Sequence, residues 1–376
     1  MQKPVFFLLV FIAALGCKDP QRSPLSEASS EILNIEYAKG FSIEQFDNYK
    51  VLTLSNPWPD AEQEFKYALV NEGFEAPSGE FDAVVELPLK NIVVTSTTHI
   101  PSLEMLEVSE KLVGFPNLDY ISSEATRRMI ADGKIMELGK NEDINTEVLI
   151  DLSPDVVVTF AVEGNNSTVN TIQKTGIPVI YNADWTETTP LGKAEWIKFF
   201  GVLFGKEKEA DSIFKTIETG YNAARETAAK ATETPKVLSG AMYKDVWYLP
   251  QGNSWAAQFI KDANGDYLWN DTEGTGSLSL NLEAVLEKGK NAEYWIGPGQ
   301  FVSKQQMEDA HSVYAQFDPF QNNHIYSFTT RKGETGGVLY YELAPNRPDL
   351  VLKDIIKILH PELLPEHQLY FFSRIE

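Results

Sequence analysis

Blocks of apolar and polar residues alternate along the chain in a way that predicts strands followed by helices. From position 91 onward, short apolar runs of strand length are each paired with a stretch that has helical spacing. The predicted pairs are 92–95 with 101–110, 112–115 with 123–131, and a helix at 166–175 with a strand at 177–181. Strands that alternate with helices are typical of parallel β–α–β units with right-handed crossovers. The chain is therefore predicted to form mainly parallel α/β sheets.

One helix-to-strand unit occurs twice, at 145–160 and again at 281–297. Each copy begins with Asn, a residue that caps helices well, and carries Glu two residues later, Glu147 in the first and Glu283 in the second. A carboxylate in the first helical turn is stabilised by the helix dipole, which is the first interpretation of both residues. The recurrence predicts two similar α/β lobes.

A long helix is predicted at 206–231, between the two copies. Its apolar residues recur at helical spacing, at Ala210, Ile213, Phe214, Ile217, Tyr221 and Ala224. Twenty-odd residues at a rise of 1.5 Å each give a rod of roughly 35–40 Å. Pro235 ends the pattern. A single long helix between two lobes is expected to act as a stiff link.

Other parts of the chain have different patterns. Short alternating runs within 32–81 predict antiparallel strands, interrupted by Asn-Pro-Trp-Pro at 56–59. The second lobe is expected to open with strands at 237–243 and 246–249 and to end with a last strand at 324–328 and a terminal helix. The expected organisation is a signal peptide (1–17), a tether (18–30), an N-terminal lobe (31–204), a linking helix (205–234) and a C-terminal lobe (235–376).

Composition and charge exclude several classes of protein. The 376 residues carry a formal net charge of -22, which argues against a nucleic-acid-binding protein and against a polybasic membrane-surface protein. The single cysteine excludes intramolecular disulfides and cysteine clusters for zinc or iron–sulfur. An apolar fraction of 43% is ordinary for a globular protein with a sizeable core.

The single cysteine, Cys17, follows an apolar stretch at 5–15 that has the length of a signal-peptide core. The sequence Ala-Leu-Gly-Cys at 14–17 resembles a bacterial lipobox, in which the Cys is acylated and becomes the mature N-terminus; Ala14 stands where Leu is commoner. An ordinary secretory signal with an incidental Cys is the alternative. We expect a lipid-anchored protein of the periplasm or cell envelope whose only membrane contact is the lipid.

Catalytic motifs are not evident. The chain has no GxSxG elbow and no GxGxxG after a strand, and the lysine-containing run at 201–206 has the wrong spacing for a P-loop. No two of the five histidines are spaced i, i+4 for a zinc helix. His99 alone lies just past a strand end, and we expect a surface-loop histidine there.

Aromatic residues give a stronger indication of function. Several are expected in loops that follow strands on the two lobes, namely Phe115, Tyr120, Phe160, Trp185, Tyr243, Trp255 and Tyr340. Such loops would face each other across a cleft, and aromatic walls suit a large flat or ring-bearing ligand. Arg331, after the strand at 324–328, is a candidate anion contact. Core packing is the alternative for each aromatic residue, and a solvated surface position is the alternative for Arg331.

The order of several segments resembles a known family. The segments are a Val-Gly-Phe loop within 112–120, the unit at 145–160, a Thr-Gly-Ile-Pro-Val turn at 175–179, the linking helix, the segment 278–286 and Pro-Asp-Leu at 348–350. Together they resemble the substrate-binding proteins of iron-siderophore and vitamin B12 ABC importers. The segment before Asn91 is longer than is usual in that family.

The resemblance implies two α/β lobes joined by one long rigid helix, with the ligand cleft between the lobes. It implies a monomer without a cofactor that binds a siderophore, haem or cobalamin and delivers it to an ABC permease dimer with its ATPase. A Glu at the tip of each lobe would be recognised by permease arginines, and the matching positions are Glu147 and Glu283.

The leading hypothesis is thus a non-enzymatic binding protein for an iron complex, with cobalamin as the alternative ligand. Two rivals remain open. One is a surface lipoprotein enzyme acting on a glycan or cofactor, and the other is a surface-exposed partner that receives ligand from an outer-membrane receptor.

Overall fold

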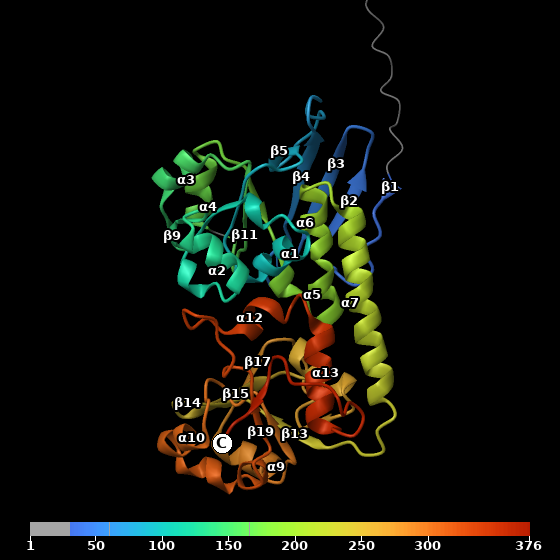
Figure 1. The fold of residues 1–376 in the computed structure, drawn as a ribbon, viewed down its shortest axis with the longest axis vertical. Coiled ribbons are helices and arrows are strands. Elements are labelled where there is room, and N and C mark those ends of the chain that lie inside the picture. Colours follow the sequence, from blue (N-terminus) through green and yellow to red (C-terminus); the bar gives the residue numbers. More distant parts are fainter. Residues whose placement is uncertain (1–30, 60, 165) are drawn as a thin grey trace, which may run out of the picture.

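The chain folds into two α/β lobes that are stacked along the long axis of the molecule (Figure 1). This arrangement comes from a computed structural model, which describes residues 31–59, 61–164 and 166–376. The signal peptide, Cys17 and the tether lie outside the described residues. Within the described ranges, no helix is both long enough and apolar enough to cross a membrane.

The N-terminal lobe is built on a parallel sheet with five strands. In order across the sheet, these are β12 (Val179–Tyr181), β11 (Val156–Thr159), β6 (Ile92–Val94), β7 (Leu112–Phe115) and β8 (Met136–Glu137). The two central strands, β6 and β11, are buried along their whole length, as expected for strands covered on both faces. The connecting helices are α1 (Ile100–Met105), α2 (Glu124–Ala131), α3 (Thr146–Leu152) and α4 (Ser167–Gln173). The predicted succession of strands and helices is confirmed.

A second five-stranded sheet precedes this lobe and packs onto it. Its strands are β1 (Glu31–Ile32), β2 (Phe41–Gln45), β3 (Tyr49–Ser55), β4 (Glu64–Asn71) and β5 (Ala83–Leu87). Strands β1 to β4 are antiparallel, as predicted, whereas β5 pairs with β4 in parallel. The hydroxyl of Tyr67 on β4 accepts a hydrogen bond from the backbone N–H of Tyr181, which ties this sheet to the edge of the parallel sheet.

Helix α7 (Glu207–Ala228) is the predicted long helix, and it runs beside both lobes in Figure 1. It packs on α6 (Ile197–Leu203) of the first lobe and on α13 (Pro348–Leu359) of the second. The buried face of α7 packs into the core of the first lobe near its start and into the core of the second lobe near its end. Residues such as Phe214 belong to the hydrophobic core of the first lobe, and residues such as Tyr221 belong to that of the second. One continuous helix therefore contributes side chains to both cores.

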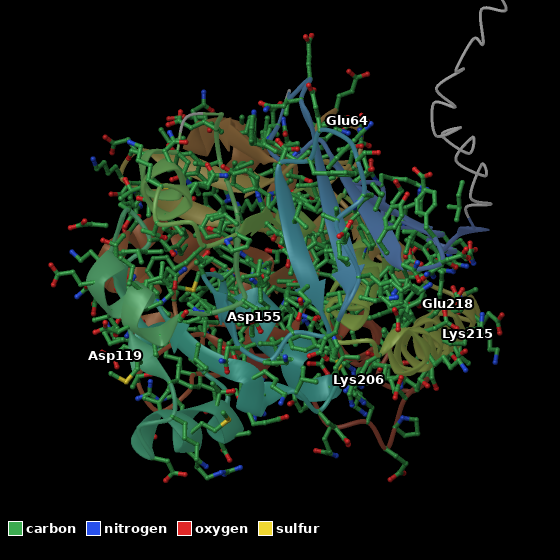
Figure 2. All side chains as sticks on the ribbon, turned by 90° about the horizontal axis from the view of Figure 1, so that it is seen from above. Glu64, Asp119, Asp155, Lys206, Lys215 and Glu218 are labelled. Carbon is green, nitrogen blue, oxygen red and sulfur yellow. The ribbon has the colours of Figure 1, made fainter. Side chains whose placement is uncertain are left out.

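Glu218 lies on α7 where the first core gives way to the second. Its carboxylate accepts hydrogen bonds of 2.6 Å from the hydroxyl of Tyr37 and from the ammonium group of Lys215. Figure 2 labels Glu218 and Lys215, which lie close together on this helix. The bonds from Lys215 and Tyr37 lower the pKa of Glu218, and the bond to Glu218, together with burial, raises the pKa of Tyr37 to about 12. The long helix is thus hydrogen-bonded to the segment that leads into the N-terminal sheet.

The C-terminal lobe has a five-stranded sheet in the order β16 (Asp266–Tyr267), β13 (Lys236–Ser239), β18 (Tyr294–Ile296), β19 (Ile325–Ser327) and β20 (Ser373–Arg374). An antiparallel sheet beside it contains β14 (Ala241–Tyr243), β15 (Val246–Pro250) and β17 (Ser277–Leu280). The helices are α8 (Trp255–Asp262), α9 (Leu282–Gly289), α10 (Lys304–Ala310), α11 (Asp318–Gln321), α12 (Leu339–Leu343) and α13.

Several details differ from the sequence-based prediction. The strand expected at 237–243 is divided at Gly240, whose φ of 76° breaks the extended backbone. The helix expected at 101–110 ends at Met105, close to Glu107, which has a left-handed φ of 57°. The strand at 324–328 is not the last, because β20 returns antiparallel to β19.

Candidate functional site

The two lobes are bridged by the segment that follows β19. Residues 328–338 lead into α12, which lies between the lobes in Figure 1. The hydroxyl of Thr335 donates a hydrogen bond of 2.7 Å to the carbonyl of Asp119. The carboxylate of Glu342 on α12 accepts hydrogen bonds from the backbone N–H groups of Ser122 (2.6 Å) and Ser123 (2.9 Å). A C-terminal segment therefore forms one wall of the space at the carboxyl ends of the N-terminal strands.

A central pocket of about 270 Å³ lies at those strand ends. The N-terminal lobe supplies its wall from the loops after β6, β7 and β11, and the C-terminal lobe supplies residues 337, 338 and 341. Its side chains include Ser96, Phe115, Tyr120, Asn141, Phe160, Val338 and Tyr341. Tyr120 and Tyr341 are 63% and 49% exposed, so both present surface that a ligand could cover. The pocket lies where open α/β sheets bind ligands.

Tyr340 and Tyr341 are neighbours in sequence but have different surroundings. Tyr340 is only 6% exposed and stacks on Phe328 at a ring-centroid distance of 4.3 Å, within a cluster that includes Phe371 and Phe372. Burial raises its pKa. Tyr340 therefore packs in the C-terminal core, which was the alternative weighed for each aromatic residue, whereas Tyr341 lines the central pocket.

A second pocket, of about 560 Å³, lies beside the end of β12. Trp185, from the loop after β12, and Trp255, at the start of α8, line it from the two lobes. Trp58, from the Asn-Pro-Trp-Pro sequence of the N-terminal sheet, forms a third wall. Lys193 of α5 (Pro190–Glu195) also lines this pocket, and its ammonium nitrogen lies 5.4 Å from the ring centroid of Trp255. We therefore call this cavity the tryptophan pocket.

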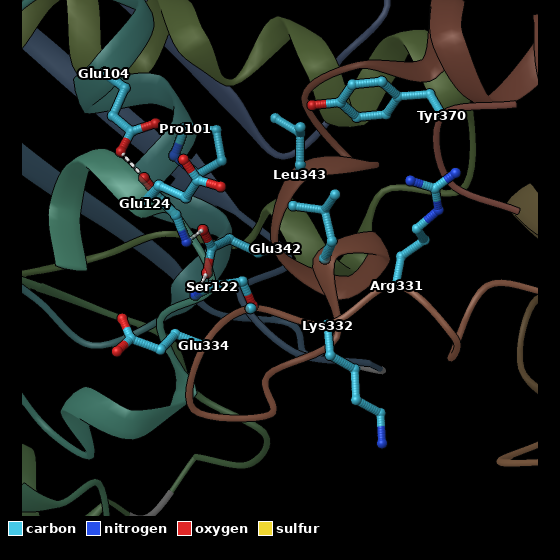
Figure 3. A pocket seen from close by; sticks show the side chains of 13 residues that line it. Pro101, Glu104, Ser122, Glu124, Arg331, Lys332, Glu334, Glu342, Leu343 and Tyr370 are labelled. Carbon is cyan, nitrogen blue, oxygen red and sulfur yellow. Dashed lines mark hydrogen bonds between the residues drawn. The ribbon is translucent and has the colours of Figure 1, made fainter. Parts of the chain in front are cut away.

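A third cavity, of about 630 Å³, lies beside α12 (Figure 3). Arg331 and Tyr370 line it on one side, and Glu104, Glu124 and Glu342 line it on the other. Arg331 donates a hydrogen bond of 3.2 Å to the carbonyl of Leu369. The cavity therefore carries opposite charges on its two sides.

Glu342 has the most perturbed carboxyl group in this region. Burial raises its pKa to about 7, the neighbouring Glu104 carboxylate acts in the same direction, and the N–H groups of Ser122 and Ser123 oppose the shift. Glu104 in turn accepts hydrogen bonds from the hydroxyls of Ser123 and Thr126. This network joins α12 to the start of α2.

Two other residues considered from the sequence, Tyr243 and His99, do not line these pockets. Tyr243, on the β14–β15 hairpin, is 67% exposed, and the three cavities described above are lined by other residues. His99 is not a surface-loop histidine, as had been expected, because it is fully buried and packs beside Phe200 at a centroid distance of 5.4 Å. Burial lowers its pKa. Within the described ranges, no group of three or more His, Cys, Asp or Glu residues is arranged to hold a metal ion.

Glu147 and Glu283 occupy equivalent places on the two lobes. Each is exposed in the first turn of its helix, α3 or α9. The capping side chains are Asn145, which accepts from the N–H of Val148, and Asn281, which accepts from the N–H of Ala284. The caps satisfy helix-terminal N–H groups, so both carboxylates remain directed to solvent.

The lining residues that the sequence does not reveal include Trp58, Asn141, Lys193 and Tyr341. The Asn-Pro-Trp-Pro sequence was visible as a break in the strand pattern, but its position beside β12 depends on the packing of one sheet against another. Lys193 and Tyr341 lie in short helices whose orientation no local pattern specifies. Of the candidates that had been named, Tyr120 and Phe160 line the central pocket, Trp185 and Trp255 line the tryptophan pocket, and Arg331 lines the third cavity.

Comparison with known proteins gives consistent findings. Residues 92–331 match a family model described as periplasmic binding protein. An uncharacterised lipoprotein of Methanocaldococcus jannaschii is 25% identical over 375 residues, which cover 93% of this chain and 87% of the relative.

Two solved structures have a similar fold at low sequence identity. A possible iron-binding periplasmic solute-binding protein from Staphylococcus epidermidis superimposes with a TM-score of 0.57 at 16% identity, over 73% of this chain and 99% of that one. A periplasmic vitamin B12-binding protein of Vibrio cholerae does so with a TM-score of 0.52 at 12% identity, over 74% and 99%. Identities this low establish the shared fold alone.

Proposed function

This chain belongs to the periplasmic binding protein family, and from that premise we propose that it is a lipid-anchored substrate-binding protein of an ABC importer. In this proposal it captures an iron complex, either a siderophore or haem, between its lobes and delivers that complex to a permease dimer with its ATPase. The ligand is released chemically unchanged, and the protein acts as a monomer.

The central pocket is the observation that carries this proposal. It lies at the carboxyl ends of parallel strands and receives side chains from both lobes, so that a ligand there would contact Phe160 on one lobe and Tyr341 on the other. Pockets for small molecules are mostly apolar with a few polar groups, and Ser96 and Asn141 supply such groups here. This arrangement supports capture of a ligand rather than chemistry on it.

The character of the walls bears on the ligand. Four aromatic side chains line the central pocket and three line the tryptophan pocket, which suits a ligand with a large flat surface. An anionic iron complex also requires cations. Arg331 and Lys332 line the third cavity, and Lys39 and Lys193 line the tryptophan pocket. Since aromatic residues outnumber arginines, cobalamin is the second candidate ligand.

The membrane attachment proposed here rests on Cys17 and the lipobox-like sequence before it. It is supported by the relative in Methanocaldococcus jannaschii, which is described as a lipoprotein. An anchor at the N-terminus would hold the lobes near the membrane through the tether at 18–30.

The proposal is tested by titrating the purified protein with ferric siderophores, haem and cobalamin while tryptophan fluorescence is followed. Replacing Phe160 or Tyr341 by Ala should weaken binding by about 1–4 kcal/mol, the range expected for an aromatic contact at the centre of a binding site. Tyr248→Ala is the matched control, because Tyr248 is an exposed aromatic residue outside the three cavities. Binding of none of these ligands, or chromatographic recovery of an altered ligand, would contradict the proposal.

A further inference from the structure

The tryptophan pocket has a wall that lies outside the segment matched to the family. Residues 92–331 match the family model, whereas Lys39, Gly40 and Trp58 come from the N-terminal sheet that precedes it. The other walls come from the loop after β12 and from α8 of the second lobe. The additional sheet thus completes a cavity that its two lobes alone would leave open on one side.

The wall formed by the N-terminal sheet is firmly held. The buried carboxylate of Glu187 accepts hydrogen bonds from the N–H groups of Lys39 (2.7 Å) and Gly40 (2.9 Å) and from the indole N–H of Trp196 (3.1 Å). Trp58 packs edge-on against Tyr181 of β12, with a centroid distance of 6.3 Å. Its position is therefore fixed by the same strand that leads to Trp185.

Three tryptophan side chains line this cavity, and none of them is fully buried. Trp58 and Trp255 are half-buried, and Trp185 is 38% exposed. Each ring keeps part of its apolar face open to the cavity, and burial of such a face against a planar ligand is favourable. A cavity of about 560 Å³ is within the usual range for a small-molecule site.

Lys193 supplies a buried cation to the pocket, whose polar lining also includes Lys39 and the Glu187 carboxylate. Its buried ammonium group donates hydrogen bonds of 3.0 Å to the carbonyls of Asp184 and Trp185. An ammonium group has three donors, so a third N–H remains for an acceptor on a ligand. Burial lowers the pKa of Lys193, while the nearby carboxylates of Asp184 and Glu187 act in the opposite direction.

We propose that the tryptophan pocket is a subsite for a planar heteroaromatic ring that carries an anionic or hydrogen-bond-accepting group, with the ring against the indoles of Trp58, Trp185 and Trp255 and the acceptor at Lys193. The subsite would contribute to cargo recognition, so this inference rests on the proposed function. It selects cargo that bears such a ring. The pocket lies beside the end of β12, and the neighbouring strand β11 leads to Phe160 of the central pocket.

Two flavins provide a matched pair of probes, since flavin mononucleotide and riboflavin share one planar heteroaromatic ring system and differ by a phosphate. Flavin fluorescence is quenched when the ring stacks on tryptophan, so the quenching reports binding directly. We expect saturable binding of both probes by the full-length protein, with flavin mononucleotide bound more tightly. Absence of saturable quenching by either probe would overturn the proposal.

Variants locate the binding. Trp58→Ala should weaken binding of both flavins by about 5- to 100-fold, the equivalent of one lost ring-stacking contact. Phe74→Ala, which removes an exposed aromatic ring from the turn after β4 in the same sheet, should leave binding unchanged. Lys193→Met should remove the preference for the phosphate-bearing flavin. Equal affinity of the Trp58→Ala variant and the unmodified protein would overturn the proposal even if the Lys193 variant fails to fold.

The same variants separate this inference from the proposed function. If Tyr341→Ala weakens binding of a siderophore, haem or cobalamin while Trp58→Ala changes neither cargo nor flavin binding, the subsite is wrong and the function stands. If the protein binds none of these cargoes but binds flavins through Trp58, the proposed function fails and the ring site stands.

Discussion

The carboxylate of Glu342 on α12 lies 2.6 Å from the backbone nitrogen of Ser122, which belongs to the opposite lobe. A second bridge lies nearby, where the side-chain amide of Asn346 accepts from the hydroxyl of Ser102 and donates to the carbonyl of Thr98, both at 2.9 Å. These contacts link the two lobes directly. The relative position of the lobes therefore depends on a buried carboxyl group as well as on the long helix.

The first prediction concerns the pH dependence of stability due to Glu342. Its pKa in the folded protein is about 7, above the ordinary value of 4.5, so the folded state binds a proton more tightly than the unfolded state. The stability contributed by this group is full below pH 4.5 and is lost as the pH rises through 7. Between pH 4.5 and 7, the unfolding free energy of the unmodified protein should therefore fall relative to that of Glu342→Gln. The fall should be at most about 1.4 kcal/mol per pH unit.

Thermal unfolding of both proteins at a series of pH values measures this effect. The matched control is Glu124→Gln, which removes an exposed carboxylate that lines the same cavity. The control should retain the pH dependence of the unmodified protein. A constant difference in melting temperature between the unmodified protein and Glu342→Gln at every pH would contradict the prediction.

The second prediction concerns Glu195, which anchors the N-terminal sheet. This carboxylate has no solvent exposure and accepts hydrogen bonds from the N–H groups of Glu36, Tyr37 and Ala38, and it is also paired with Lys198 at 2.9 Å. Glu195→Gln would place an amide NH₂ against N–H donors and would remove the buried carboxylate partner of Lys198, which would keep the exposed Asp211 at 3.3 Å. Because removing one partner of a buried pair is costly, we expect a loss of about 3 kcal/mol or more in unfolding free energy.

Chemical denaturation gives the change in free energy, and limited proteolysis reports whether the segment at 36–40 is released first. Glu209→Gln, at an exposed position on α7, is the control for loss of one carboxylate. Equal stability of the Glu195 and Glu209 variants would show that the backbone N–H groups at 36–38 find other partners.

The repeated unit and the long helix were predictable because each depends on local patterns. The buried apolar runs, the Asn caps and the 3.6-residue spacing of α7 are present in the sequence, and the structure confirms the strands and helices that they predict. The antiparallel start was predictable for the same reason. Chain reversal within the C-terminal lobe was not, since β20 lies beyond a long irregular segment and pairs with β19 through contacts distant in sequence.

The site was less predictable than the fold, and Tyr340 and Tyr341 show why. Successive residues on a helix point about 100° apart, so one of two adjacent tyrosines faces the core and the other faces the cleft. The sequence contains no signal that determines which tyrosine faces the core, because α12 has only five residues and is too short to show a periodic apolar pattern. Trp58 was missed for a different reason, since its approach to Trp185 requires the packing of the N-terminal sheet against β12.

The third prediction concerns the membrane anchor at Cys17, which lies outside the described residues. Cys17→Ser removes the thiol that would be acylated, so the variant should move from the membrane fraction to the soluble fraction. Its affinity for cargo should not change, because the tether separates residue 17 from the lobes. Fractionation of cells that express each protein gives the result, and equal membrane retention of the variant would contradict lipidation at this residue.

The last prediction concerns Glu147 and Glu283. Both carboxylates are exposed in the first turns of α3 and α9, one on each lobe, and could meet two equivalent arginine pockets on a two-fold permease. Charged pairs at the rim of an interface mostly determine association rate and register. The double variant Glu147→Ala with Glu283→Ala should therefore keep its fold and its ligand affinity but lose productive docking, measured as stimulated ATP hydrolysis in vesicles that carry the importer.

The control for this prediction removes equal charge from the same two helices. Asp151 and Glu287 are exposed near the C-terminal ends of α3 and α9, and their double replacement by Ala should leave stimulation intact. If Glu147 and Glu283 only complement the helix dipoles, their loss would cost about 0.3–1 kcal/mol of stability each and would not affect transport. Normal stimulation of ATP hydrolysis by the Glu147 and Glu283 variant would therefore establish the dipole role. A loss of docking appears in the ATP hydrolysis assay, whereas a loss of the dipole interaction appears only in the unfolding free energy.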